Sequence, residues 1–143
     1  MWWLLACSPP PAPVSTAPAP VPVPAPAVDP DPEPAFEEFQ AATWIAERLR
    51  AHGFDVVHPA GSLATAIRAV RRGGVGDTGP RIGILAEYDA LPGLGHGCGH
   101  NTMAASGVGA AIALAALADE LAGEIVFLGT PAEERGSGKQ VMI

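Results

Sequence analysis

The chain has 143 residues, a formal net charge of −7 and 16 prolines. The acidic balance argues against a nucleic-acid partner, because the only basic cluster, Arg68, Arg71 and Arg72, is short and has no interleaved aromatic residues. Most prolines lie in residues 8–34, where they restrict φ and remove backbone donors, so we expect an extended, disordered spacer there. Residues 35–143 remain to form one small core.

The two cysteines, Cys7 and Cys98, lie on opposite sides of this spacer, so no disulfide framework is expected. Residues 1–7, MWWLLAC, resemble the tail of a bacterial lipoprotein signal, but they contain no Lys or Arg and their apolar stretch is short. Four explanations of residues 1–7 stay open: lipidation of Cys7 in the cell envelope, a truncated signal, a misassigned start codon and chance. A cytoplasmic location is favoured.

The segment after the spacer has helix and strand patterns in turn. Apolar residues recur at three- and four-residue spacing over 33–54, which predicts a helix with a stop at Gly53. Short strands are expected at 54–57 and 63–70. After a glycine-rich turn, the apolar run Ile82 to Ala86 predicts a buried strand.

A glycine-rich loop then leads into a helix over 102–123, with Asn101 or Thr102 as the cap. This helix is rich in Ala and Gly, so we expect it to be buried against a sheet rather than to cross a membrane. A strand follows at 124–130. The order strand, helix, strand predicts a parallel pair, and hence an α/β fold with a mainly parallel sheet and packed helices.

The loop carries His96, Cys98 and His100 in the sequence GHGCGH. Spacing of two in an extended chain places alternate side chains on one side, and thiolate and imidazole are good zinc ligands. A flexible glycine turn with incidental histidines is the alternative. A structural zinc site would need a fourth ligand and CxxC-like spacing, which the loop does not have.

Carboxylates follow both strands of the expected parallel pair, at the ends where ligands gather in such sheets. Of the adjacent Glu133 and Glu134, one can ligate a metal ion while the other takes a proton from water. Asp89 is expected to orient a metal ligand, and Glu87 is a weaker candidate for that role. The alternative is that the pair Glu133 and Glu134 and the pair Glu87 and Asp89 are solvated carboxylates that bind nothing.

Three ordered motifs carry a resemblance: ILAEYDALPGLGHGCGHN, the small-residue helix and GTPAEERGSGK. Over about residues 29–143 they resemble the zinc-dependent family of aminoacylases, carboxypeptidase G and indole-acetyl-amino-acid hydrolases. The nearest branch is that of aminobenzoyl-glutamate hydrolase and β-alanyl-lysine dipeptidase, which shares Asn101. The resemblance implies two divalent ions, Zn or Mn.

The same resemblance implies a role for each motif residue. Cys98 is expected to bridge the two ions, His100 and Glu134 to be further metal ligands, and Glu133 to be the general base. His96 matches a position that is not a usual ligand.

Relatives of this family supply two more histidine ligands further along, and a lid domain that dimerises and grips the substrate carboxylate. His52 and His58 do not match those ligands. We therefore expect an N-terminal fragment of a catalytic domain, inactive alone, with a homodimer only in a longer form that has the lid.

The expected activity is hydrolysis of an amide bond in a small-molecule substrate, a dipeptide or an N-acyl amino acid. One alternative is a non-catalytic metal-binding or envelope-tethered module. Another is a thiol hydrolase with Cys98 as nucleophile and His96 or His100 as base; it is weak, because imidazoles so close in one loop are poorly placed to deprotonate the thiol between them.

Overall fold

The computed structural model describes residues 31–76 and 78–143, so the proposed signal remnant with Cys7 and most of the expected spacer lie outside the described residues. Its centre is a four-stranded sheet in the order β1-β2-β4-β3. The strands are β1 (Asp55–Val57), β2 (Ile67–Arg72), β3 (Arg81–Ala86) and β4 (Glu124–Gly129). The helices are α1 (Phe39–Ala51), α2 (His100–Ala115), the 3-10 turn η1 (Ala118–Glu120) and α3 (Gly138–Val141).

The strands β3 and β4 are parallel and α2 connects them, as the sequence predicted. Their register pairs Ala86 with Gly129, so both strands end at the same level and their following loops lie together. The α/β class is therefore confirmed. The sheet as a whole is mixed rather than mainly parallel, because β2 runs antiparallel to both β1 and β4.

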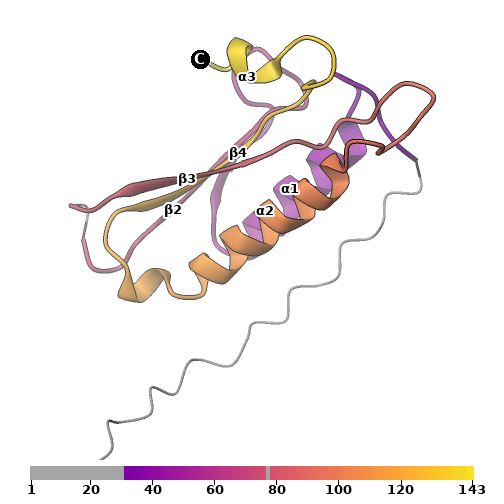
Figure 1. The fold of residues 1–143 in the computed structure, drawn as a ribbon. Helices are drawn as coiled ribbons and strands as arrows, with labels where there is room; N and C mark the ends of the chain where they lie inside the picture. The colour runs from indigo at the N-terminus through magenta and orange to yellow at the C-terminus, as the bar shows by residue number, and fades with distance from the viewer. Residues whose placement is uncertain (1–30, 77) are drawn as a thin grey trace, which may run out of the picture.

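Both long helices lie on one face of the sheet, and the core lies between these two layers (Figure 1). Its largest fully buried apolar side chains are Ile45, Leu49, Ile67, Tyr88, Ile112 and Phe127. The small residues of α2 permit close packing: a Cβ added to Gly107 would lie 3.1 Å from the Cβ of Ala86. Among the described residues no helix has the length and hydropathy needed to cross a membrane.

The first helix begins at Phe39, later than the expected start at residue 33. Phe36 has φ +65°, which a helix cannot contain. The side chain of Glu33 instead folds back and accepts hydrogen bonds from the backbone N–H groups of Gln40 and Ala41, at 2.8 and 2.9 Å. Residues 31–34, assigned by sequence to the spacer, thus contact the folded part; Pro34 also forms an isolated bridge with Ala90.

Two further expectations about elements were wrong. The strand β3 was expected to be buried, but it is the edge of the sheet, and Ile82 and Leu85 are 50% and 56% exposed. The helix α2 starts at His100, and its N-cap is Gly99 with φ +79° rather than Asn101 or Thr102. Glycine adopts this left-handed conformation without steric cost, so the chain can turn sharply into the helix.

Candidate active site

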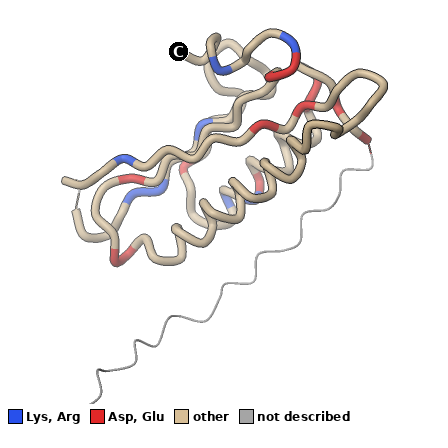
Figure 2. The backbone as a smooth tube through the Cα atoms, in the orientation of Figure 1, with Lys and Arg blue, Asp and Glu red and all other residues tan. Residues whose placement is uncertain are grey.

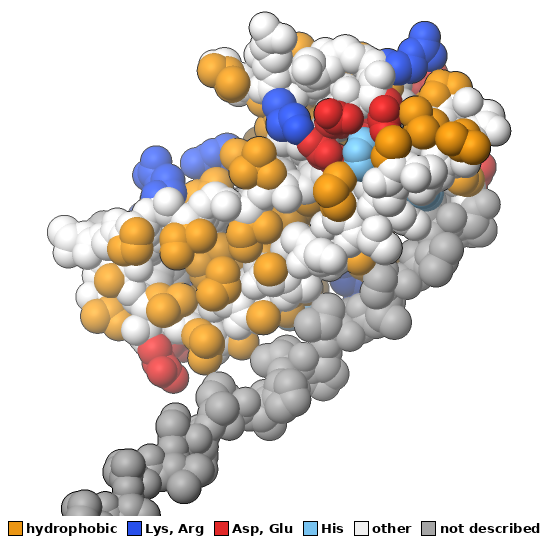
Figure 3. Space-filling model, viewed as in Figure 1, with side chains coloured by type: hydrophobic (Ala, Val, Ile, Leu, Met, Phe, Trp, Pro, Cys, Tyr) orange, Lys and Arg blue, Asp and Glu red, His pale blue; other side chains and the backbone are white. Residues whose placement is uncertain are grey.

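The candidate site lies where β3 and β4 end and α2 begins. Acidic residues are concentrated at this end of the molecule (Figure 2), and acidic side chains lie beside a histidine there, with a basic side chain next to them (Figure 3). The two strand ends are joined by Thr130, whose backbone N–H and hydroxyl both donate to the carbonyl of Ala86, at 2.8 and 3.2 Å. The loops after the two strands are therefore held side by side.

His100 is the buried centre of this site. Its Nδ1 lies 3.0 Å from Oδ1 of Asp89 and 3.0 Å from the Asp89 carbonyl oxygen, and both side chains are almost fully buried. Because both of these neighbours are acceptors, Nδ1 carries the proton and donates it. The other ring nitrogen, Nε2, is then free to act as a ligand.

Three carboxylates surround that free nitrogen. Nε2 of His100 lies 3.4 Å from Oε2 of Glu87, 3.8 Å from Oε2 of Glu133 and 3.9 Å from Oε1 of Glu134. Ligand atoms of Glu87, His100 and Glu133 all lie within 4.8 Å of one another. Glu134 is fixed by its backbone, whose N–H donates to Oδ2 of Asp89 at 2.9 Å.

This donor set fits a divalent metal ion. Two ligand atoms that share a tetrahedral zinc, each about 2.1 Å from it, lie about 3.4 Å apart, and the distances from Nε2 are close to that value. Imidazole with carboxylates suits zinc, and the oxygen-rich composition also suits manganese. Asp89 is placed to fix the ring of His100, as carboxylates do for metal-bound imidazoles.

Cys98 reaches the same site but is exposed. A hydrogen bond to the carboxylate of Glu134, together with desolvation and the charges of Glu133 and Asp89, raises the pKa of the thiol. A neighbouring carboxylate has this effect because it disfavours a second negative charge. The thiol of the metal-free protein is therefore kept protonated, and a bound cation would reverse this preference.

Two features of the site go beyond the expectations from sequence, in which Glu87 was only a weaker candidate for orienting a metal ligand and Lys139 had no role. Glu87 contributes a carboxylate as close to His100 as those of the Glu133–Glu134 pair, and Lys139 of α3 forms an ion pair with it. The signal for Glu87 was its spacing of two from Asp89, which places both at one strand end. His96 does not join the metal-ligand candidates; within the described part of the chain its two buried ring nitrogens have no hydrogen-bond partner.

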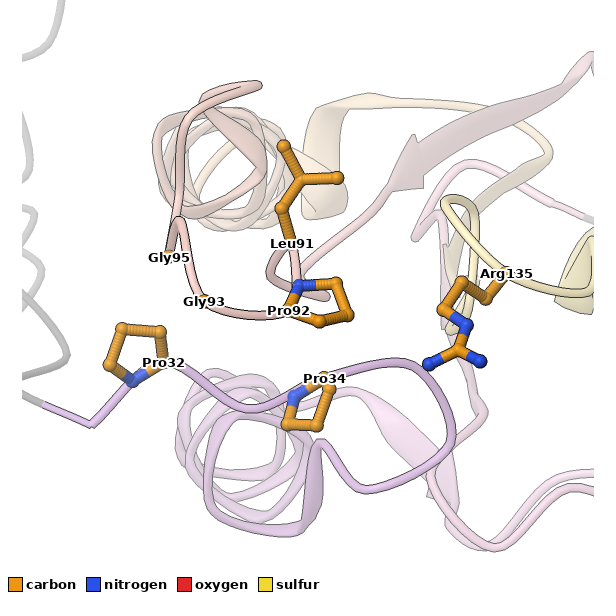
Figure 4. A pocket seen from close by; sticks show the side chains of 7 residues that line it. All are labelled: Pro32, Pro34, Leu91, Pro92, Gly93, Gly95 and Arg135. Atoms are coloured by element: carbon orange, nitrogen blue, oxygen red, sulfur yellow. The ribbon is translucent and has the colours of Figure 1, made fainter.

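A hollow of about 370 Å³ opens beside the loops that carry these residues. Its walls are formed by two proline-containing segments, and Arg135 lies at one side (Figure 4). The lining residues are Pro32, Pro34, Leu91, Pro92, Gly93, Gly95 and Arg135. Arg135 directly follows Glu134 and forms no ion pair with any residue in 31–76 or 78–143.

Comparison with known proteins agrees with this geometry. The chain is 42% identical over 123 residues to the Xaa-Arg dipeptidase of Mus musculus, covering 68% of this chain and 28% of the dipeptidase. It is 37% identical to a subunit of the p-aminobenzoyl-glutamate hydrolase of Escherichia coli, covering 76% and 26%. A crystal structure of the Bacillus subtilis YXEP protein, a dinuclear metal-binding peptidase from the M20 family, superposes with a TM-score of 0.64 at 32% identity, covering 72% and 32%.

The chain spans about a quarter to a third of the length of these relatives. The profile of peptidase family M20/M25/M40 matches residues 49–143, which is most of the folded part. The chain belongs to peptidase family M20/M25/M40.

Proposed function

We propose that this chain supplies part of the active site of a metal-dependent amidohydrolase that cleaves an amide bond in a dipeptide or an N-acyl amino acid. The observation that carries the proposal is the convergence of the carboxylates of Glu87, Glu133 and Glu134 on Nε2 of His100. The relatives named as a dipeptidase and as an aminobenzoyl-glutamate hydrolase support the reaction class.

Two divalent ions, Zn or Mn, would be held by His100, Glu134 and Cys98, and the position of Glu87 makes it a further candidate. When bound, such ions act as Lewis acids that polarise a carbonyl and lower the pKa of water. The chain's own contribution is to fix the ligands: Asp89 holds the ring of His100 on one side and the backbone of Glu134 on the other.

Glu133 is the proposed general base. Its side chain is 41% exposed, compared with 17% for Glu134, so it is the more accessible of the two carboxylates to water and substrate. Glu133 would accept a proton from the attacking water and then donate it to the amine that leaves when the amide C–N bond breaks. A general base in this role contributes on the order of 10²–10⁴-fold to the rate.

A small-molecule substrate is proposed to bind in the hollow beside the site. Its apolar proline walls and the guanidinium of Arg135, which forms no ion pair within the described residues, suit a molecule with an apolar part and a carboxylate. The products of dipeptide or N-acyl amino acid cleavage carry such a carboxylate.

The thiol-hydrolase alternative is disfavoured by the surroundings of Cys98. A nucleophilic cysteine needs a lowered pKa, whereas the carboxylate of Glu134 raises the pKa of this thiol.

The test is a chimera in which this chain replaces the matching part of the Escherichia coli aminobenzoyl-glutamate hydrolase. We expect metal-dependent amide hydrolysis from the chimera and no measurable hydrolysis from the chain alone. Glu133→Gln should keep the metal and lose about 10²–10⁴-fold in kcat, and Glu134→Gln should weaken metal binding itself. A chimera that binds metal without turnover would favour the non-catalytic metal-binding module, and near-full turnover in Glu133→Gln would contradict the mechanism.

A further inference from the structure

Glu38 is a completely buried carboxylate at the start of α1, with 0% exposure. No ion pair includes it within residues 31–76 and 78–143, so neutral donors alone satisfy its two oxygens. A buried carboxylate without a cationic partner is costly, and it persists only where its hydrogen bonds are well made. The residues that donate hydrogen bonds to the carboxylate of Glu38 therefore indicate its role in the fold.

One oxygen of Glu38 reaches the loop that carries the proposed catalytic pair. The backbone N–H of Ala132 donates to Oε1 at 2.8 Å, across 94 positions of sequence. The hydroxyl of Thr65 donates to Oε2, also at 2.8 Å. The carboxylate thus joins the first turn of α1, the segment before β2 and the loop after β4.

Capping of α1 does not require this side chain. The N–H groups of Gln40 and Ala41 are already satisfied by the carboxylate of Glu33. Glu38 occupies the N-cap position, yet its side chain makes no hydrogen bond to the helix. Its carboxylate is therefore directed to Ala132 rather than to the end of the helix.

Ala132 adopts an unusual backbone conformation immediately before Glu133. Its φ is +58°, in the left-handed region that residues other than glycine seldom occupy. Such a conformation persists only where neighbouring contacts hold it, and it tends to occur at functional sites. The contact that holds the Ala132 N–H is the one from Glu38.

We propose that Glu38 is a positioning residue that holds Ala132 in its left-handed conformation and thereby sets the direction of Glu133 and Glu134. Rotation at Ala132 would turn both following side chains away from His100, because they are the next two residues of the chain. The consequence for metal binding rests on the proposed function, whereas the anchoring of Ala132 does not.

The same network extends to the loop after β3. The hydroxyl of Tyr88 donates to the carbonyl of Thr65 at 2.6 Å, and Tyr88 directly precedes Asp89. Thr65 is therefore bound at two points: its hydroxyl donates to Glu38, and its backbone carbonyl accepts from Tyr88. The backbone carbonyl of Thr65 thus supports the loop after β3, whereas its hydroxyl is a separate contact to Oε2 of Glu38, the oxygen that does not hold Ala132.

The anchoring is tested without metal by amide hydrogen exchange of the 143-residue chain. We expect the Ala132 amide to exchange at least about 100-fold more slowly than in an unfolded peptide. Glu38→Gln should preserve that protection, because its amide oxygen still accepts from Ala132 and the Thr65 hydroxyl can rotate to accept from its NH₂ group. Rapid exchange of Ala132 in the folded parent chain would overturn the proposal.

The consequence for the site is tested by titrating the chain with Co²⁺, whose visible spectrum reports ligand geometry. Glu38→Leu should weaken Co²⁺ binding at least about tenfold and alter the spectrum, while Glu38→Gln should remain within about threefold of the parent chain. Thr65→Val is the matched control, since it removes the other hydrogen bond of the same carboxylate; it should lower Tm without changing Co²⁺ affinity. Adding Ala132→Gly to Glu38→Leu should restore part of the affinity, because glycine adopts φ +58° unaided.

Unchanged Co²⁺ affinity and spectrum in a folded Glu38→Leu chain would show that Glu38 only stabilises the core. The same conclusion would follow if Glu38→Leu and Thr65→Val lost affinity in proportion to Tm. If Glu38→Leu does not fold, protection of Ala132 in the parent and in Glu38→Gln decides the proposal. A parent chain that binds no Co²⁺ would count against the proposed function, and the exchange of Ala132 would still decide the anchoring.

Discussion

The carboxylate of Asp89 lies 3.0 Å from Nδ1 of His100, and neither residue is more than 4% exposed. This contact keeps the proton on Nδ1 and directs Nε2 toward the carboxylates of the site. It is the arrangement that carboxylates adopt behind metal-bound imidazoles, where their replacement costs about 10- to 100-fold in metal affinity.

Asp89→Ala should therefore weaken Zn²⁺ or Mn²⁺ binding by about 10- to 100-fold, as measured by isothermal titration calorimetry on the 143-residue chain. The variant also leaves the Glu134 N–H without its acceptor. Asp119→Asn is the control, because Asp119 is a highly exposed partner of Arg71 and lies in η1, away from the site. Equal affinities in Asp89→Ala and the parent would contradict the orienting role of Asp89.

Lys139 is expected to oppose metal binding, since its ammonium group already pairs with the carboxylate of Glu87. Lys139→Met should free that carboxylate and remove a positive charge from the site. A partly exposed ion pair is worth about 1 kcal/mol at most, so the gain in metal affinity should be about fivefold and should shrink at high salt.

Two variants control for the charge of Lys139. Lys139→Arg should behave like the parent chain, and Arg81→Met, which removes an ion pair with Glu124 at the opposite end of β3, should have no effect on affinity. Weaker binding in Lys139→Met would instead show that Lys139 supports the site.

The parallel unit β3-α2-β4 and the meeting of Asp89, His100, Glu133 and Glu134 could be predicted from the sequence. Periodicity defines the two strands and the helix between them, and parallel strands bring their carboxyl ends together. The direction of β2 could not be predicted, because a short strand pattern is the same in parallel and antiparallel pairs. The exposure of Ile82 and Leu85 on β3 was missed for a related reason: an apolar run does not indicate which strand forms the edge.

Contacts between residues far apart in the chain could not be predicted from sequence either. Glu87 and Lys139 are 52 positions apart, and Glu38 and Ala132 are 94 apart. Nothing in the local pattern around any of these four residues indicates its partner. The late start of α1 has a similar cause, because the Glu33 side chain caps it from outside the helix.

Tyr88 should remain un-ionised well above pH 10 while the protein is folded. Its pKa is raised by burial first, and then by the charges of Glu38 and Asp89. A raised pKa in the folded state stabilises the fold fully below the unfolded value of about 10, and this contribution is lost as the pH rises above it. Stability should therefore decline progressively with pH from about 10 upward.

This behaviour can be measured directly because Tyr88 is the only tyrosine of the chain. Its ultraviolet ionisation should coincide with loss of the circular dichroism of the fold rather than precede it. Tyr88→Phe should lower the free energy of unfolding by about 1 kcal/mol, since it removes a hydrogen bond to Thr65, and its stability should depend less on pH above 10. Ionisation near pH 10 with the fold intact would contradict the raised pKa.

The central claim is that His100 and its surrounding carboxylates form a metal site, and calorimetric titration of the 143-residue chain with Zn²⁺ tests it most directly. His52 supplies the matched control: it lies at the end of α1, with its Nδ1 2.8 Å from the carbonyl of Arg48. We predict that His100→Ala abolishes the strongest Zn²⁺ binding and that His52→Ala leaves it unchanged. Zn²⁺ affinity in a folded His100→Ala chain equal to that of the parent would contradict the claim.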